Sequence, residues 1–560
     1  MTRFEQRRTD RIQKYTDAGL WGKDMLHDLL ARNVTATPER EAVVDQPNKS
    51  ELMGATAQRL SLAQLEAASS ATAHELARRG VGSGDAVILQ LPNTSELIVL
   101  YYALSKLGAI IAPIAVQYGQ QEITHFAREL DPCALITVDE LRGARLAEQA
   151  RTCLPGTPVW SVTEDLDVFA GKDDEPSPEP WARDANRTLT IAWTSGTTGT
   201  PKGVPRSHNM WMCQGRLTCH PIGLQDGDRL LSPFPMINMA ALGGFLFPSA
   251  LNNCTLVLHH PLEVPLYLQQ LQDERISYTL APPPLLNRLA QQPALWQGFD
   301  FSALRAIGTG SVPLSPAMID TFETRFATPI LNFYGSNEGV GLISTPETAA
   351  NPQHRAVLFP RIGVEGIAFE SYAPDVLFTK VVDPDTGEEV KEPGVPGELC
   401  VDGPGVFDGY HHHDNADVFT EDGFFRSGDL VQIDPDEPSH YRIVGRCKDI
   451  INRGGVKLSP AEIDAQLEGI PGLAEAAACP VRDDDLGERV CACVVLADGA
   501  VPPALEDLRA QLTARGLTRF KLPERLEIFD ALPRNPLGKV VRGDLTREVA
   551  ARCSAADESA

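Results

Sequence analysis

The first third of the chain alternates between short apolar runs and segments with helical periodicity. Strand-like apolar runs cover residues 85–91, 109–114 and 134–138. Residues 96–106 carry apolar side chains at the i, i+3, i+4 and i+7 positions of an amphipathic helix, and Gly108 follows as a stop signal. Such alternation of strand and helix favours parallel sheets with helices on both faces.

A second pattern begins near residue 445 and indicates a smaller domain. Residues 461–467 and 504–515 read as helices, and residues 474–479 and 490–496 read as strands. This stretch is large enough for a small α+β domain. We therefore predict an α/β protein with an N-terminal domain of residues 1–447 and a C-terminal domain of residues 448–560.

The composition favours a globular protein and argues against nucleic acid as a partner. Of the 560 residues, 43% are hydrophobic, and 50 basic against 75 acidic residues give a net charge of −25. This charge opposes non-specific nucleic-acid binding, which depends on cations that neutralise phosphates. The N-terminal residues lack the apolar core of a signal peptide, and no apolar run is long enough to span a bilayer. We expect a cytoplasmic protein without a membrane span.

The cysteines and histidines do not form a recognisable metal motif. The eleven cysteines include no C-x-x-C pair, and Cys133, Cys479, Cys491 and Cys493 lie in apolar, strand-like runs. They are expected to be reduced core residues rather than disulfide or metal ligands. The histidines at 411–413 lie in a polar loop without a partnering cysteine, which argues against a metal site there.

Residues 194–203 read T-S-G-T-T-G-T-P-K-G and carry the clearest chemical signal. Glycines allow backbone N–H groups to approach a ligand closely, and successive N–H groups form a concavity for phosphate oxygens. Residues 188–193 read as a strand, so the loop is expected at a strand end where open α/β sheets bind ligands.

Two other interpretations of this loop are weaker. A Walker P-loop requires Lys followed by Ser or Thr at the start of a helix. Here Pro201 precedes Lys202 and Gly203 follows it. A plain polar surface loop remains the alternative if the segment is taken alone.

Five further segments accompany the Gly-rich loop in a fixed order. They are Y-G-S-N-E at 334–338, R-S-G-D at 426–429, G-R-C-K-D at 445–449, R-G-G-V-K-L-S-P-A-E at 453–462 and P-R-N-P-L-G-K at 533–539. Their order and spacing resemble the adenylate-forming superfamily, which contains acyl- and aryl-CoA synthetases, peptide-synthetase adenylation domains and luciferases. Each segment alone is a weak signal, whereas six in order are specific.

The resemblance implies a fold and a two-step reaction. The large domain would hold two doubly wound sheets and a distorted β-barrel, and the small α+β domain would be mobile. A carboxylic acid would attack the α-phosphate of ATP, releasing pyrophosphate and leaving an acyl-adenylate. The thiol of CoA or of a carrier protein's phosphopantetheine would then displace AMP. Both steps need charge to be neutralised where it develops.

The resemblance also assigns roles to residues. Lys539 would bind the carboxylate and α-phosphate oxygens, and Glu338 would place Mg²⁺. The β- and γ-phosphates would contact Thr194, Ser195, Gly196, Thr197, Thr198, Gly199 and Lys202. The adenosine and the thiol channel would be framed by Gly308, Gly310, Tyr334, Gly335, Ser336, Asp429, Arg446, Gly455 and Lys457. Asn238, Met239, Gly339 and Val340 would line the acid pocket, and Lys448 would be the hinge between the domains.

Residues 8–21 resemble the leader of stand-alone aryl-acid AMP ligases, and small-acid CoA ligases share much of the remaining pattern. Three positions depart from the family. Asn238 replaces an aromatic residue or histidine, Met239 replaces the asparagine that binds a 2-hydroxyl, and Asn337 replaces a threonine. A pocket without that hydrogen-bond partner loses its preference for the hydroxyl. We expect a small aromatic or alicyclic acid that is not an ortho-hydroxybenzoate.

Other functions stay open at the level of sequence. A non-catalytic nucleotide-binding scaffold could share the fold, although Lys202, Glu338, Asp429 and Lys539 are all retained. A luciferase-like enzyme would share only the first half-reaction. The expected partners are a small carboxylic acid and CoA or an acyl or aryl carrier protein.

Overall fold

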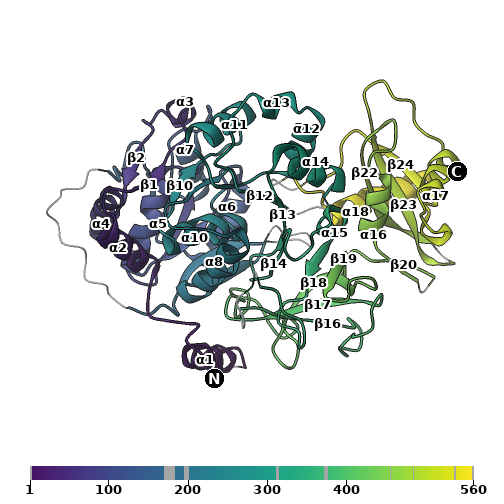
Figure 1. Ribbon diagram of the computed structural model, residues 1–560, viewed down its shortest axis with the longest axis horizontal. Coiled ribbons are helices and arrows are strands. Elements are labelled where there is room, and N and C mark those ends of the chain that lie inside the picture. Colours follow the sequence, from purple (N-terminus) through teal and green to yellow (C-terminus); the bar gives the residue numbers. More distant parts are fainter. Residues whose placement is uncertain are drawn as a thin grey trace. The chain divides into compact units, whose positions relative to one another are not determined.

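The computed structural model describes residues 3–169, 183–194, 201–310, 314–370, 372, 376–454, 456–483, 485–534 and 538–557. The chain divides into two compact units, which we call the larger and the smaller unit (Figure 1). The larger unit comprises Met1–Thr194, Lys202–Phe378 and Val401–Phe425. The smaller unit comprises Ser195–Pro201, Thr379–Cys400 and Arg426–Ala560.

An eight-stranded sheet in the larger unit has the order β14-β13-β12-β11-β9-β10-β1-β2. Its inner neighbours are parallel, and the two edge strands, β14 and β2, pair antiparallel. The strands are β1 (Glu41–Val44), β2 (Arg59–Ser61), β9 (Arg229–Ser232), β10 (Thr255–Leu258), β11 (Tyr278–Leu280), β12 (Ala306–Gly310), β13 (Ile330–Gly335) and β14 (Gly341–Ser344).

A six-stranded sheet in the same unit has the order β6-β5-β3-β4-β7-β8. Its strands are β3 (Ala86–Gln90), β4 (Ile110–Pro113), β5 (Ala134–Thr137), β6 (Val159–Ser161), β7 (Thr188–Trp193) and β8 (Gly203–Ser207). All neighbours are parallel except β7 and β8, which pair antiparallel on either side of the Gly-rich loop. The four strands predicted in this region are confirmed as β3, β4, β5 and β7.

Helices pack on these sheets, and the one predicted as amphipathic is buried along its whole length, so the expectation of a solvent-exposed polar face is wrong. The predicted helix at 96–106 is α5 (Ser95–Leu107), and Gly108 ends it in the left-handed conformation at φ 69°. The other helices of this unit are α1 (Arg3–Asp17), α2 (Leu26–Ala36), α3 (Lys49–Met53), α4 (Leu62–Arg78), α6 (Gln120–Leu130), α7 (Leu146–Cys153), α8 (His208–Ile222), α9 (Met239–Ala241), the π-helix η1 (Leu242–Leu246), α10 (Phe247–Leu251), α11 (Val264–Asp273), α12 (Pro283–Gln291), α13 (Ala294–Gln297), α14 (Pro316–Phe326) and α15 (Pro352–Arg355), with the short strand β15 (Leu358–Pro360).

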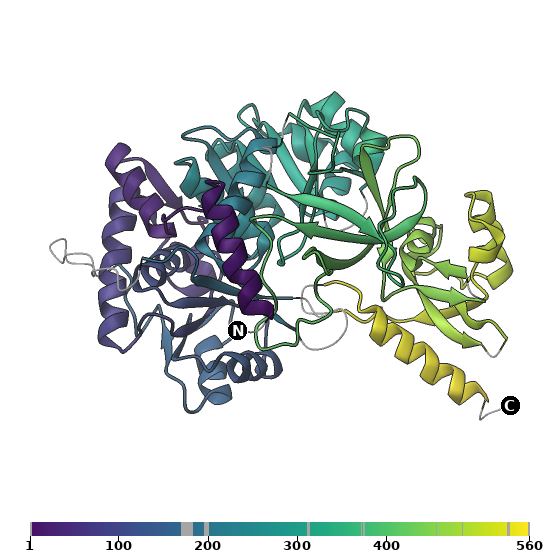
Figure 2. The same cartoon turned by 90° about the horizontal axis from the view of Figure 1, so that it is seen from below.

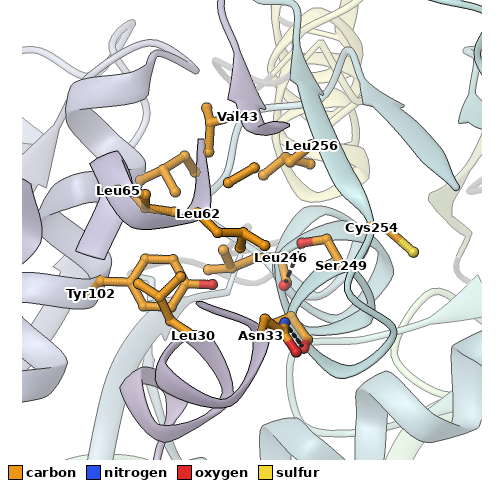
Figure 3. Close-up of a pocket in the computed structure, with 13 residues that line it drawn as sticks. Leu30, Asn33, Val43, Leu62, Leu65, Tyr102, Leu246, Ser249, Cys254 and Leu256 are labelled. Carbon is orange, nitrogen blue, oxygen red and sulfur yellow. Dashed lines mark hydrogen bonds between the residues drawn. The ribbon is translucent and has the colours of Figure 1, made fainter. Parts of the chain in front are cut away.

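Among these helices lies an interior pocket between α2, α4, α5 and strands β1 and β10 (Figure 3). Leucine side chains make up much of its wall, and Asn33 donates to the carbonyl of Ala250 at 2.8 Å. No residue predicted for the catalytic site lines it. We attribute it to core packing.

The smaller unit holds two groups of strands and the C-terminal helices. Strands β16 (Phe378–Val382), β17 (Pro396–Asp402), β18 (Phe425–Ile433) and β19 (His440–Arg446) follow one another in a sheet. A second sheet has the order β21-β20-β23-β22, with β24 parallel on β23. Its elements are β20 (Ile451–Arg453), β21 (Val456–Leu458), α16 (Pro460–Leu467), β22 (Leu473–Asp483), β23 (Gly487–Leu496), α17 (Leu505–Ala514), the 3-10 helix η2 (Arg519–Lys521), β24 (Arg525–Phe529) and α18 (Arg542–Asp557). The four elements predicted after residue 460 are confirmed.

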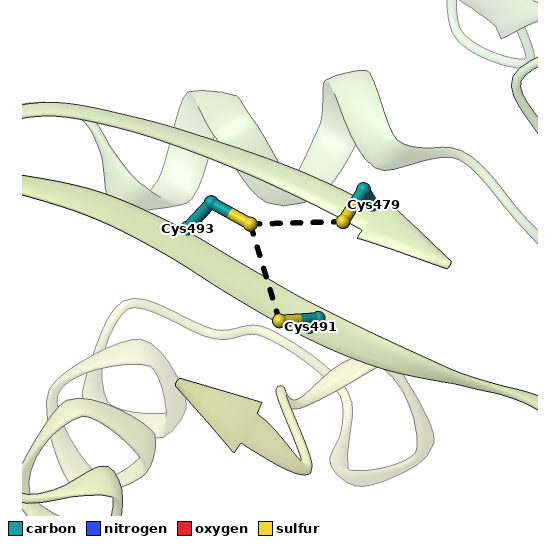
Figure 4. Close-up of side chains that lie close together, drawn as sticks. All are labelled: Cys479, Cys491 and Cys493. Carbon is teal, nitrogen blue, oxygen red and sulfur yellow. Dashed lines mark hydrogen bonds between the residues drawn. The ribbon is translucent and has the colours of Figure 1, made fainter. Parts of the chain in front are cut away.

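Successive side chains of β22 and β23 point to opposite faces of the sheet and contribute to two hydrophobic cores. One face carries Ala478, Val490 and Ala492 toward α16 and α17. The other face belongs to a core with Leu545 and Val549 of α18, and it carries three buried cysteines. They are Cys479, Cys491 and Cys493, whose sulfur atoms all lie within 4.8 Å of one another (Figure 4).

These thiols lie in a core that is otherwise made of apolar side chains. Hydrogen bonding with Cys479 and burial raise the pKa of Cys493. All eleven cysteines are free thiols. Of the four expected in the core, Cys479, Cys491 and Cys493 are buried, whereas Cys133 is only partly buried. Within the described ranges, no helix combines the length and the apolar character needed to cross a bilayer.

Candidate active site

The Gly-rich loop is described only at its two ends. Predicted phosphate ligands Ser195, Gly196, Thr197, Thr198 and Gly199 lie outside the described residues. Thr194 and Lys202 close the base of the loop, because the backbone N–H of Thr194 donates to the Lys202 carbonyl and the N–H of Lys202 donates to Thr194 Oγ1, both at 3.0 Å. The strand pairing of β7 with β8 thus fixes where the loop leaves and re-enters the sheet.

Glu338 lies in the turn after β13 and is only 8% exposed. Its Oε1 accepts a hydrogen bond of 2.7 Å from the Tyr410 hydroxyl, and its carbonyl accepts one of 2.8 Å from the N–H of Phe407. Among the described residues, no hydrogen bond reaches Oε2. Lys202 Nζ lies 4.8 Å from the centroid of the same Tyr410 ring. One tyrosine therefore contacts both the predicted metal carboxylate and the predicted phosphate lysine.

Two features of this turn suit a magnesium ion and its phosphate ligands. A carboxylate with one uncommitted oxygen is the type of ligand that Mg²⁺ takes in proteins. Within the part of the chain that the structure describes, Ser336 Oγ is buried without a hydrogen-bond partner. A buried polar atom of this kind calls for a ligand or water. These groups fit the ion, and Glu338 is the side chain that would hold it.

Asn337 precedes Glu338 and bridges two other elements. Its amide Nδ2 donates to the carbonyl of Trp193, at the end of β7, and its Oδ1 accepts from the N–H of Met239, each at 2.9 Å. A threonine hydroxyl donates and accepts at a single oxygen, whereas the longer amide side chain has its donor and its acceptor on separate atoms. The departure at this position therefore ties the end of β7 to the start of α9.

A buried arginine donates hydrogen bonds to the backbone of the same turn. Arg206 of β8 donates to the carbonyl of Asn337 at 2.9 Å and to that of Gly405 at 2.6 Å. Burial lowers the pKa of its guanidinium to about 9, against the opposing effect of Glu338. Gly339 packs tightly against Gly405, because a Cβ at position 339 would lie 2.4 Å from the Gly405 carbonyl oxygen.

The predicted acid-pocket residues Asn238 and Met239 begin helix α9. Asn238 is its N-cap, and its Oδ1 accepts from the N–H of Ala241 at 3.3 Å. The sulfur of Met239 lies beside Gly243 of the π-helix, where a Cβ would approach it to 3.0 Å. Val340 is fully buried. The cap uses one polar atom of Asn238 and leaves its Nδ2 for other partners.

The predicted adenine-side glycines lack room for a side chain. A Cβ at Gly308 would lie 2.4 Å from the Tyr278 hydroxyl oxygen, and one at Gly310 would lie 2.0 Å from the Phe333 carbonyl oxygen. Tyr334, on the same strand as Gly335, packs against Phe359 with ring centroids 5.7 Å apart. These glycines are required by the packing of β12 against its neighbours β11 and β13, whatever ligand the strand ends contact.

Three predicted residues come together in the smaller unit. Arg446 Nε and Asp429 Oδ1 form an ion pair of 2.7 Å, and the two residues are direct partners across β18 and β19. The charges of both residues affect the pKa of Lys539. Desolvation lowers its pKa, Arg446 lowers it further, and Asp429 acts in the opposite direction. Lys539 is exposed as a residue, so the desolvation is only partial.

Three more predicted residues, Lys448, Gly455 and Lys457, follow Arg446 in the sequence. Lys457 pairs through its backbone with Asn452 in the β20–β21 hairpin, and Gly455 lies outside the described residues. Lys448 lies inside a turn in which the N–H of Asp449 donates to the Arg446 carbonyl at 3.2 Å. Asp449 in turn lies 3.7 Å from Arg542 at the start of α18.

Three residues of this neighbourhood have no counterpart among the sequence predictions. They are Arg11, Arg206 and Tyr410. Arg206 could have been noticed as a charged residue within the apolar strand run after the Gly-rich loop. Tyr410 lies in a polar loop, where nothing in the local pattern distinguishes it. Arg11 lies in the leader, whose resemblance was noted without a role for any single residue.

The family can now be stated from comparison with known proteins. Residues 30–411 match the family model described as AMP-binding enzyme, and residues 462–539 match the one described as AMP-binding enzyme C-terminal domain. The first match alone covers more than half of the chain. This chain belongs to the AMP-binding enzyme family.

Individual relatives agree with that assignment. The chain is 30% identical over 491 residues to feruloyl-CoA synthase of an Amycolatopsis species, covering 87% of this chain and 94% of that protein. It is 29% identical over 564 residues to pyochelin synthase PchD of Pseudomonas aeruginosa, covering 97% and 96%. The solved structure of ATP-bound MatB from Rhodopseudomonas palustris is similar with a TM-score of 0.76 and 26% identity, covering 93% and 98%.

Membership confirms the reaction class that the motifs predict. The protein is an AMP-forming acid–thiol ligase, which activates a carboxylic acid as an adenylate and then forms a thioester. ATP, magnesium and a thiol of the CoA type are the partners of this chemistry. The predicted mixed α/β fold, with a large N-terminal and a small C-terminal part, is likewise confirmed.

Proposed function

We propose that Lys539 neutralises the carboxylate and α-phosphate oxygens during adenylation. The observation that supports this most directly is the grouping of Lys539 with Arg446 and Asp429 in the smaller unit. A flexible ammonium beside an aspartate that can accept ribose hydroxyls suits a nucleotide, because the two groups address its anionic and its hydroxylic parts.

In the larger unit, Glu338 offers its uncommitted oxygen to Mg²⁺, while Thr194 and Lys202 contact the β- and γ-phosphates. Each group would stabilise charge that the departing pyrophosphate gains. Their shared contacts through Tyr410 support a common role. Phosphate binding by residues 195–199, and contact of Gly308, Gly310 and Ser336 with the adenosine, belong to the same proposal.

The substrate we propose is a small aromatic or alicyclic acid without an ortho-hydroxyl group. Asn238 and Ser336 are the polar side chains beside the apolar Met239 and Val340. Feruloyl-CoA synthase, among the relatives, carries an aromatic acid in its name. An amino acid is disfavoured because no aspartate stands out for an α-ammonium.

The acceptor we propose is CoA rather than a carrier protein, and the site of action is the cytoplasm. Carrier proteins are generally acidic, and this chain has a net charge of −25. Long-range repulsion would slow such docking unless a local basic patch offset it. CoA, as a small thiol, needs no extended docking surface.

Between the half-reactions, we propose that residues 448–560 rotate about Lys448. The rotation would withdraw Lys539 and bring Gly454, Gly455 and Lys457 to the thiol channel. The left-handed Gly454, at φ 58°, supports this use of the segment, since a bulky side chain there would be strained as well as obstructive.

Acid-dependent exchange of labelled pyrophosphate into ATP tests the first half-reaction. A panel of benzoic, cinnamic, alicyclic and short-chain acids should give exchange with at least one aromatic or alicyclic member. Adding CoA, or a holo-carrier protein in a parallel arm, should release AMP only with CoA. A protein that binds ATP but exchanges with no acid would be a scaffold, and oxygen uptake or light emission would indicate luciferase-like chemistry.

A further inference from the structure

Helix α1 and the turn that follows it pack on a strip of chain at residues 403–410, which we call the 403–410 segment. In Figure 2 this helix is the dark purple one beside the N-terminal label. Trp21, 4% exposed, donates its indole N–H to the Pro404 carbonyl at 3.1 Å. Tyr15 and Trp21 also form a small apolar core with Met210 and Cys213 of α8. The leader is thus part of the folded body of the larger unit.

Arg11 makes the most extensive of these contacts. It is 6% exposed, and its two terminal nitrogens donate to four acceptors of the 403–410 segment. The acceptors are the carbonyls of Gly403 (2.8 Å), Val406 (2.7 Å) and Phe407 (2.9 Å) and the Asp408 carboxylate (3.0 Å). Only a guanidinium offers enough donors in a fixed plane to satisfy several carbonyls at once. Arg11 therefore defines the path of this segment.

The opposite side of the 403–410 segment contacts the predicted metal carboxylate. The N–H of Phe407 donates to the Glu338 carbonyl, and the Tyr410 hydroxyl donates to Glu338 Oε1. Arg206 joins the carbonyls of Asn337 and Gly405. The buried chain from Arg11 through the 403–410 segment to Glu338 consists of hydrogen bonds of ordinary length throughout.

We propose that the leader is a positioning element for catalysis. Arg11 fixes the 403–410 segment so that Tyr410 occupies Oε1 of Glu338, which leaves Oε2 directed to Mg²⁺, and so that the Tyr410 ring faces Lys202. Tyr410 and Arg11 are positioning residues and do not touch the reacting atoms. This inference rests on the proposed role of Glu338.

Tyr410→Phe tests the last step of this chain of contacts. Loss of the hydroxyl should raise the Mg²⁺ concentration for half-maximal pyrophosphate exchange about 10- to 100-fold, as expected for one lost hydrogen bond to a charged group, with little change in KM for the acid. Tyr267→Phe is the matched control, because it removes a tyrosine hydroxyl that donates to the Leu280 carbonyl and lies outside the site. Its Mg²⁺ dependence should equal that of the wild type.

Arg11→Lys and Arg11→Met test the first step. Both should raise the Mg²⁺ requirement in the same direction, and combining either with Tyr410→Phe should add little, because the three changes act along one path. Arg8→Met is the control, since Arg8 lies on the same helix but donates to Asn186. If Arg11→Met does not fold, Arg11→Lys and Tyr410→Phe still decide the matter.

A second readout needs no turnover. The Mg²⁺ concentration at which ATP raises the melting temperature should shift in the same variants by the same factor. An unchanged Mg²⁺ requirement in Tyr410→Phe, or a fall in kcat in the Arg11 variants without such a shift, would overturn the inference. Absence of exchange with every acid in the wild type would instead contradict the proposed function, and the melting assay would still test the positioning of the ion.

Discussion

Glu338 and Lys539 are both assigned to the same half-reaction, yet their surroundings differ in kind. Glu338 is buried, and its side chain and carbonyl are both hydrogen-bonded by the 403–410 segment. Lys539 is exposed, and its pKa reflects the nearby charges of Arg446 and Asp429 as well as partial desolvation. A metal ligand must stay in one place, whereas a lysine that serves only one of two steps has to leave. The difference predicts that changes at Lys539 affect chemistry alone, and that changes around Glu338 also affect stability.

The largest effect on chemistry is expected from Lys539→Ala. Removal of the ammonium should lower acid-dependent exchange about 1,000-fold, comparable with the loss of a strong electrostatic contact to a transition state. Attack of CoA on a supplied acyl-adenylate should remain near the wild-type rate, and the melting temperature should not change. Lys391→Ala, at an exposed lysine of the same unit, is the control. If Lys539→Ala slowed both half-reactions equally, Lys539 would not serve only one of the two steps, and its contrast with Glu338 would be wrong.

The largest effect on stability is expected from Arg206→Met. The variant leaves the carbonyls of Asn337, Gly405 and Met210 without their donor in a buried place. We expect a loss of about 3 kcal/mol in the free energy of unfolding, from the cost of unsatisfied buried groups. Urea denaturation measures it. Arg216→Met, where an exposed arginine makes a single contact with the Leu20 carbonyl, should cost far less.

A smaller effect is expected where Asn337 is returned to threonine. Asn337→Thr replaces the amide, whose donor and acceptor are separate atoms, with a shorter side chain that has both on one oxygen, so α9 should lose one tie to β7. KM for the acid should rise about fivefold, equivalent to roughly one hydrogen bond, while the Mg²⁺ requirement stays unchanged. A shift in the Mg²⁺ requirement instead of KM would place Asn337 with the metal ligands rather than with the acid pocket.

The smallest effect is a displacement of the pH profile. In its proposed role Lys539 acts as a cation, so exchange should fall as the pH rises through its pKa. Arg446 lowers that pKa and Asp429 raises it. Arg446→Met should therefore move the alkaline limb to higher pH, and Asp429→Asn should move it to lower pH, whatever either change does to the maximal rate. Limbs that coincide in all three proteins would show that another group controls this titration.

The local sequence pattern was sufficient to predict these helices and strands, but not the contacts that position the site residues. The helix at 96–106 and the strands at 188–193 and 490–496 follow from period and stop signals, which depend on neighbours along the chain. The six motifs likewise indicated the family, because each is a contiguous string. Lys539, Arg446 and Asp429 were predicted together only through that resemblance.

Residues that act across long sequence separations left no such signal. Arg11 and the 403–410 segment are almost 400 positions apart, and Tyr410 is 72 positions from Glu338. Nothing in one sequence reports which distant carbonyls a buried arginine will satisfy. The predicted domain boundary at 447/448 stays a prediction, and the compact units of the structure divide the chain differently.

That division has a consequence for how such enzymes can exchange parts. Residues 379–400 belong to the smaller unit, the next 25 residues return to the larger one, and the chain then leaves it again at Arg426. A single recombination point therefore cannot inherit both units intact from separate parents. Joining at 378 would supply a foreign Tyr410 to Glu338, and joining at 425 would pair β17 and β18 from different parents. Hybrids within this family should work best when no junction falls at 378 or 425, so that residues 379–425 and the segments on both sides come from one parent.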